Sequence, residues 1–219
     1  MIKKAISVSL LILSASIKSN AQFFIGGGAA VNSYAKGVGL FPALQPRLGV
    51  DYKEGRASIL AGFNFSPLAQ KNKFNAVYTS SDGTGKTSVL YSESLSINNA
   101  FLHIAYRLGS MENKLRFKFI FGASNDFMRL KYKANRKVPA GYKSDYTVED
   151  ASLSGPKVDI GFGADFRSSP KDDIYFEVIA GLPANQVNGQ YIYNPAALHL
   201  GFTIGYSHYF GKRDYTGEY

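Results

Sequence analysis

The sequence predicts an all-β protein, an eight-stranded antiparallel up-and-down transmembrane β-barrel. Three observations predict this fold. Apolar residues alternate with small or polar residues through most of the chain, which is the side-chain period of a β-strand. Short charged turns alternate with long irregular connections, as in barrels that cross the outer membrane of bacteria. The chain begins with the pattern of an export signal.

Residues 1–21 have the pattern of a secretory signal peptide. Two lysines precede an apolar run over residues 5–13, and small residues at Ser19 and Ala21 favour cleavage after Ala21. The run is about half as long as the roughly 20 apolar residues that a membrane-spanning helix needs. Cleavage would remove three lysines and no acid, so the formal net charge would fall from +9 to +6 (9 − 3). A basic mature chain suits anionic partners such as lipopolysaccharide phosphates or acidic glycans, although ordinary solubility charge in loops explains it as well.

The composition restricts the kinds of functional site that this chain can form. Cysteine is absent, which excludes disulfides, zinc–thiolate sites and cysteine nucleophiles. Gly, Phe and Tyr are abundant, and this combination favours strands over helices.

Eight segments alternate clearly enough to be predicted as strands. The clearest is Leu198–Phe210, and the hairpin around Ser168–Asp173 is next; the first strand, Phe23–Tyr34, is blurred by three consecutive glycines. The other short turns are Lys53–Arg56 and Ser110–Lys114, which we place on the periplasmic side with both chain ends. The long connections fall on the opposite side, at 35–42, 67–94, 131–151 and 183–197. Within the second of them, 74–78 and 87–91 flank a turn and would extend a hairpin beyond the membrane.

The row opposite the apolar residues is rich in glycine and carries scattered long charged residues. A narrow lumen needs this mixture, because small residues there must leave room for large ones. A soluble lipocalin-like barrel has the same alternation but buries the apolar row, so it remains the alternative. We predict a polar network in the lumen, formed by Arg47, Asp51, Arg107, Arg116, Asp159, Asp165, Arg167 and Glu177. Aromatic residues near strand ends would form interfacial belts: Tyr52, Tyr106, Phe166, Tyr206 and Phe210.

Three segments carry a resemblance to a known family: the signal peptide running into Asn20–Phe24, the glycine-rich Asp159–Ala164 and the closing Gly205–Phe210. They resemble the small outer-membrane β-barrel domain family of Gram-negative bacteria, PorT-like members included. The resemblance implies a barrel over residues 22–212, a polar tail over 213–219, and insertion by the barrel assembly machinery. That machinery often reads a terminal aromatic residue, and here either Phe210 or Tyr219 fits.

Motifs for catalysis or cofactor binding are weak. Gly83–Thr87 resembles part of a phosphate loop but lacks the first glycine and the following helix. His103 and His199 are expected in the lumen and His208 outside near the periplasmic rim, with no spacing that gathers metal ligands. We therefore predict no cofactor, no metal and no nucleic-acid partner. The third long connection is basic and would meet anionic sugars or lipid headgroups, or simply be solvated: Lys131, Lys133, Arg136, Lys137 and Lys143.

The sequence thus predicts a non-enzymatic, monomeric outer-membrane barrel that displays loops to a protein or glycan partner, in a structural, adhesion or secretion-associated role. Two other functions stay open. One is a narrow channel for small solutes, and the other is a lipid-modifying enzyme that would use a lumenal histidine.

Overall fold

The computed structural model describes residues 21–34, 39–52, 55–144, 148–184 and 198–210. These residues form strands whose bounds are β1 Gln22–Tyr34, β2 Gly39–Tyr52, β3 Ala57–Asn64, β4 Gln70–Ser80, β5 Lys86–Arg107, β6 Leu115–Ala134, β7 Tyr142–Lys143, β8 Ala151–Ser169, β9 Asp172–Pro183 and β10 His199–Tyr209. In this part of the chain, no helix is long and apolar enough to span a membrane. The predicted signal peptide and C-terminal tail lie outside the described residues.

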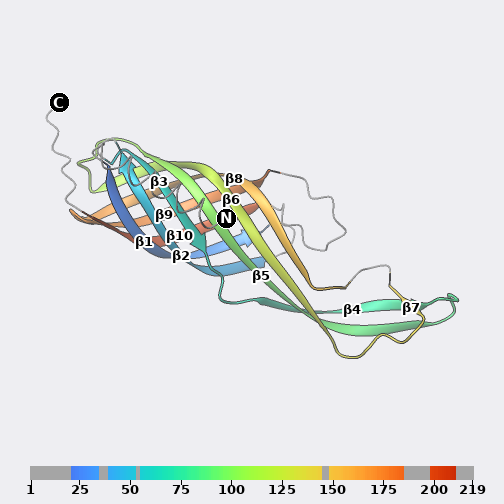
Figure 1. Cartoon of the computed structure of the whole chain (residues 1–219). Helices are drawn as coiled ribbons and strands as arrows, with labels where there is room; N and C mark the ends of the chain where they lie inside the picture. The colour runs from blue at the N-terminus through green and yellow to red at the C-terminus, as the bar shows by residue number, and fades with distance from the viewer. Residues whose placement is uncertain (1–20, 35–38, 53–54, 145–147, 185–197, 211–219) are drawn as a thin grey trace, which may run out of the picture.

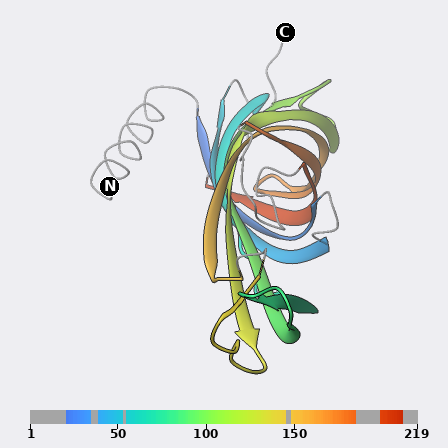
Figure 2. The ribbon, with the colours of Figure 1, turned by 90° about the vertical axis from the view of Figure 1, so that its right-hand side faces the viewer.

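Eight of these strands close into a barrel. Going round the wall, the order is β3-β2-β1-β10-β9-β8-β6-β5, and β3 pairs with β5 to complete the ring. Each of these pairs is antiparallel. Figure 2 shows the strands curving around the bore. The predicted eight-stranded antiparallel barrel is therefore confirmed.

Two of the predicted long loops contain extended sheet instead. The 67–94 connection holds β4 and the first part of β5, which pair from Gln70↔Leu95 to Thr79↔Lys86. The 131–151 connection begins as the last residues of β6, which continue to pair with β5 as far as Tyr91↔Ala134, and β7 pairs with β4. Together β4, β7, the start of β5 and the end of β6 form an arm that leaves the barrel at the end opposite the short turns (Figure 1). The hairpin predicted from 74–78 and 87–91 is present.

Two of the three predicted short turns lie wholly within the described residues, and one of these differs in length; the first includes residues 53–54, which lie outside the described residues. The second joins the end of β5 to the start of β6, and Gly109 has the positive φ of 77° that this tight reversal requires. The third is shorter than predicted, because β8 continues to Ser169 and β9 starts at Asp172. A register shift between Arg167 and Ser169 accommodates the extra residue.

The apolar row faces outwards. Phe119 and Phe162, which are paired across β6 and β8, expose 61% and 60% of their surface, while their neighbours Lys118 and Gly163 are buried. The same alternation holds along β5, β9 and β10. A water-soluble barrel would bury these aromatic residues, so the lipocalin-like alternative is wrong.

Glycines in the inner row make room for large side chains. A Cβ on Gly205 would overlap the phenol ring of Tyr175, and a Cβ on its pairing partner Gly28 would lie 2.6 Å from the hydroxyl of the same residue. Gly49 makes room for the ring of Phe24 in the same way. The glycines of the inner row therefore leave the space that large lumenal side chains occupy, as the sequence predicts.

Candidate functional site

The lumen holds a charge-balanced column of buried side chains at the end that carries the short turns. Four cations and four acids come from five strands: Arg47, Arg107, Arg116 and Lys118 with Asp51, Asp165, Asp173 and Glu177. All eight are buried. Because every charge has an opposite charge within 3.0 Å, the column satisfies the condition under which buried ions are tolerated.

Arg107 makes the most contacts at the short-turn end of the column. Its Nε donates to Asp165 at 2.7 Å, and its Nη1 donates to Asp51 at 3.0 Å. The same Nη1 donates to the Ser58 hydroxyl at 2.8 Å, and Nη2 donates to the Tyr209 hydroxyl at 3.1 Å. One guanidinium thereby links β3, β8, β2 and β10 across the bore. Arginine can do this because its planar guanidinium carries several N–H donors in a fixed arrangement.

A second chain of ion pairs continues above Arg107. Lys118 Nζ lies 2.6 Å from both Asp165 and Glu177, and Arg47 Nη1 donates to Glu177 at 2.6 Å. The Arg47 guanidinium also lies over the ring of Tyr175, with its Cζ 3.1 Å from the ring centroid. These contacts cross the bore between β2, β6, β8 and β9, so they brace opposite walls against each other.

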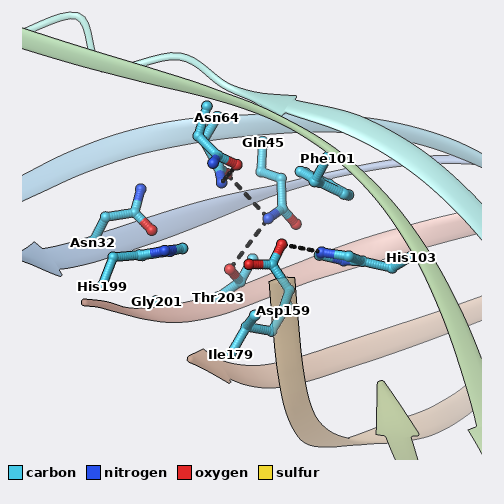
Figure 3. Close-up of a pocket in the computed structure, with 11 residues that line it drawn as sticks. Asn32, Gln45, Asn64, Phe101, His103, Asp159, Ile179, His199, Gly201 and Thr203 are labelled. Carbon is cyan, nitrogen blue, oxygen red and sulfur yellow. Dashed lines mark hydrogen bonds and ion pairs between the residues drawn. The ribbon is translucent and has the colours of Figure 1, made fainter. Parts of the chain in front are cut away.

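The middle of the lumen is polar and almost full. His103 Nε2 lies 2.8 Å from Asp159, and Lys157 pairs with Asp126. Gln45 donates to Asn64 at 3.0 Å, as Figure 3 shows among the residues around the remaining cavity. That cavity has a volume of about 10 Å³, which is room for a single water molecule.

An apolar cluster closes the lumen above this polar zone. Its members are buried inward-facing residues near the arm end of the barrel: Tyr34, Phe41, Leu95, Ile97, Met128 and Leu130. The described part of the bore thus holds ion pairs and a buried apolar cluster that includes Phe24 and Tyr209 towards the short turns, hydrogen bonds and the Lys157–Asp126 pair in the middle, and a second apolar cluster towards the arm. A solute would have to displace all three layers to pass.

The structure brings most of the predicted lumenal charges together. Seven of the eight are buried in the bore; Arg167 is on the same row but lies half-buried at the short-turn rim, where it donates to the backbone carbonyl of Met111. Sequence reasoning missed four partners: Lys118, Asp126, Lys157 and Asp173. Lys118 and Lys157 stand on rows read correctly as inward, and continuing the alternation of β6 would have found Asp126.

The histidines lie where the sequence places them. His103 and His199 are buried in the lumen, and His208 faces outwards near the short-turn rim, 2.8 Å from Asp172. No group of three or more potential metal ligands is found among the described residues. The two lumenal imidazoles are sealed from the lipid-facing surface by the barrel wall, so a lipid acyl ester has no route to them in this structure.

The predicted basic residues are distributed over the arm rather than in one loop. Lys131 and Lys133 are exposed on β6, and Lys143 is on β7. Arg136 lies beyond β6 and donates to the Thr87 hydroxyl at 2.9 Å. Lys137 is exposed in the segment between β6 and β7. Two further lysines on β4, Lys71 and Lys73, join them on the arm and were not predicted as part of a site.

Two groups on the arm have displaced pKa values. Burial and the hydrogen bond to Tyr91, 2.6 Å away, raise the pKa of Tyr78 to about 12. Hydrogen bonds from the Ser80 hydroxyl and the Thr84 backbone lower the pKa of Asp82 to about 2. The hydrogen bonds that cause both shifts lie within the β4–β5 hairpin, and those of Asp82 lie in the turn that contains Gly83.

No family model matches the chain, and no curated protein matches it either. Several solved structures do match its fold. A major outer membrane protein from Thermus thermophilus aligns with a TM-score of 0.51 at 12% identity, over 87% of this chain and 99% of that one. The attachment invasion locus protein Ail of Yersinia pestis covers 87% of this chain and 97% of its own at 10% identity (TM-score 0.45), and Neisserial surface protein A covers 88% and 98% at 10% identity (TM-score 0.45). At these identities the likeness concerns the fold, which this chain shares with the Thermus outer-membrane barrel.

Proposed function

We propose that this protein is a non-conducting outer-membrane anchor that holds a rigid β-arm above the cell surface, where the arm contacts its partner. One observation carries the proposal: β5 and β6 run without a break from the apolar barrel wall into the arm. Backbone hydrogen bonds are continuous across that junction, so the arm is fixed to the barrel instead of hanging from it by a flexible loop.

The outer surface supports insertion into a membrane. Along β8, outward residues are apolar from Phe166 to Pro156, ten residue steps. At about 3.4 Å per residue and a tilt of about 40°, this row spans about 26 Å, close to the height of about 25 Å of the apolar band on outer-membrane barrels. The pairing of β3 with β5 closes the ring, which removes the two outer sheet edges that a lipid environment disfavours.

The filled bore argues against the channel. Conduction through the described lumen would require breaking buried ion pairs, each of which costs about 3–5 kcal/mol when one partner is removed. The arm, in contrast, has a small hydrophobic core of its own, which keeps it folded outside the barrel. This core consists of Ala76, Tyr78, Val89 and Tyr91, against which Phe74, Tyr132, Val138, Tyr142 and Val148 pack.

The specific role that we propose for the arm is inferred from the sequence. The PorT-like resemblance of residues 20–24, 159–164 and 205–210 supports a structural, adhesion or secretion-associated role for the arm, and the absence of an accessible catalytic group in the described lumen supports a role without catalysis. A monomer fits a barrel that closes on itself.

Single-cysteine labelling tests the orientation, and the absence of natural cysteine removes any background. Thr84→Cys lies at the exposed tip of the arm, and Asn113→Cys lies in an exposed short turn at the opposite end. We expect a membrane-impermeant maleimide to label Thr84→Cys in intact cells and Asn113→Cys only after the outer membrane is permeabilised. Labelling of Asn113→Cys alone in intact cells would reverse the topology. In planar bilayers the purified barrel should show no steady conductance. A stable unitary current would instead support the channel function.

A further inference from the structure

A row of positive charge begins on β6 where the apolar outer row ends. Outward residues of β6 are apolar at Leu115, Phe117, Phe119, Phe121 and Phe127, and the next outward positions are Arg129, Lys131 and Lys133, all exposed. Ala123 and Asn125 lie between Phe121 and Phe127 on the same face, and the Asn125 amide is bonded to the Ser154 hydroxyl of β8. From Leu115 to Phe127 the row spans twelve residue steps, about 31 Å along the barrel axis at the usual rise and tilt; on the paired strand β8 the apolar row ends at Pro156, level with Asn125, about 26 Å above Phe166. The charges therefore start at the level of the lipid headgroups.

The register gathers four lysines into one groove on the outer face of the arm. Lys71 of β4 is opposite Ser94 of β5, which is opposite Lys131 of β6. One repeat further along the arm, Lys73, Ser92 and Lys133 are aligned in the same way. Short serines form the floor between two walls of exposed lysines, and the resulting groove has a volume of about 650 Å³.

Two acids, Glu93 and Asp150, also line this groove, and against four lysines they leave its charge positive. Glu93 is almost wholly buried on the opposite face of the sheet, where Asn72 donates to it at 3.3 Å. Asp150 accepts a hydrogen bond from the backbone N–H of Tyr132 at 2.8 Å. Four lysines thus face two acids that already accept hydrogen bonds, and the site has the chemistry for an anion with several acceptor oxygens.

We propose that this groove binds the phosphate group of a lipid in the outer leaflet, with the acyl chains of that lipid lying along the apolar wall below. The inference rests on the proposed function, because it places the arm just outside the membrane. A lipid fits this groove better than a soluble polyanion does, because the groove opens onto the same face of the sheet as the lipid-facing row. Below its floor, the short side chains Asn98 and Ala100 lie on the outer face of β5, opposite Phe127 and Phe63 respectively.

Lipid binding is tested on the full barrel in zwitterionic nanodiscs. The groove variant is Lys71→Gln, Lys73→Gln, Lys131→Gln and Lys133→Gln together; the control is Lys86→Gln, Lys114→Gln, Lys137→Gln and Lys143→Gln, which removes the same charge from exposed positions elsewhere. The probes are lipid A with its phosphates, dephosphorylated lipid A, and a soluble sulfated polysaccharide. Heat-modifiable gel migration verifies that each variant forms the barrel.

We expect the groove variant to bind phosphorylated lipid A about tenfold or more weakly than the parent, as loss of several lysines at an anionic surface implies, and the control to stay within about twofold. Dephosphorylated lipid A should bind the parent as weakly as phosphorylated lipid A binds the groove variant. Equal losses in both variants, equal binding of the two lipids, or a preference for the soluble polysaccharide would each overturn the proposal. The nanodisc assay is independent of orientation in cells, so a reversed cysteine-labelling pattern would refute the proposed function without deciding lipid binding.

Discussion

Replacing Phe162 with arginine tests whether the apolar row lies in hydrocarbon. Phe162 faces outwards on β8 with 60% of its surface exposed, and it lies one residue from the middle of the row that runs from Phe166 to Pro156. That places its side chain about 3 Å from the midplane of a band about 26 Å high. An arginine at this depth should destabilise the folded barrel by about 2–4 kcal/mol.

Phe166→Arg is the matched control, because it makes the same replacement on the same strand and face. Phe166 lies four residues nearer the periplasmic end, about 10 Å lower, where an arginine reaches the headgroups and the cost should be about 0–1 kcal/mol. Reversible denaturant unfolding in phospholipid vesicles measures both. If the two variants lose equal stability, or if Phe162→Arg unfolds within about 1 kcal/mol of the parent, this surface does not lie in lipid.

Three further predictions concern the lumen and the arm. Arg107→Met should cost about 3–5 kcal/mol in the same unfolding assay, since it leaves buried carboxylates without their shared partner, and a cost below about 1 kcal/mol would show that the column does not brace the barrel. Gly181→Leu should abolish heat-modifiable migration because a Cβ there would overlap Nδ1 of His199, and the added change His199→Ala should restore it; failure to rescue would mean that the imidazole does not occupy this space. Carboxyl NMR should show Asp82 titrating at about 2 and, in Ser80→Ala, nearer 3.8. Because the folded pKa is lowered, this turn contributes its stability above about pH 4 and loses it as the pH falls towards 2, and an unchanged titration in Ser80→Ala would contradict the assigned hydrogen bond.

The inward position of the lumenal charges could be predicted, but their pairing could not. Period-two alternation tells which face of a strand a residue such as Arg47 occupies. Its partner Glu177 is 130 positions away on a strand that is not its neighbour, and the two meet across the bore. Their relative height depends on the stagger of the whole ring, which no local pattern records.

The arm shows a second limit of local reading. The stretches at 74–78 and 87–91 alternate well enough to suggest a hairpin, but Lys71, Lys73 and the serines of β5 have no strand signal, and Lys131 and Lys133 look like part of a polar loop. Pairing of β4 and β6 on either side of β5 holds these residues in a sheet. Polar strands of this kind gain their order from neighbouring strands and from a small shared core, not from their own propensity.

The sequence by itself determined the strand count, the alternation of short and long connections, and the division of each strand into an apolar and a small-or-charged row, because these follow from the two-residue period and from turn chemistry. Only the tertiary structure decided which row faces outwards, that the bore is filled from end to end of its described part, and that four lysines from two strands flank one row of serines. These properties depend on ring closure and stagger, which bring together residues that are far apart in the chain.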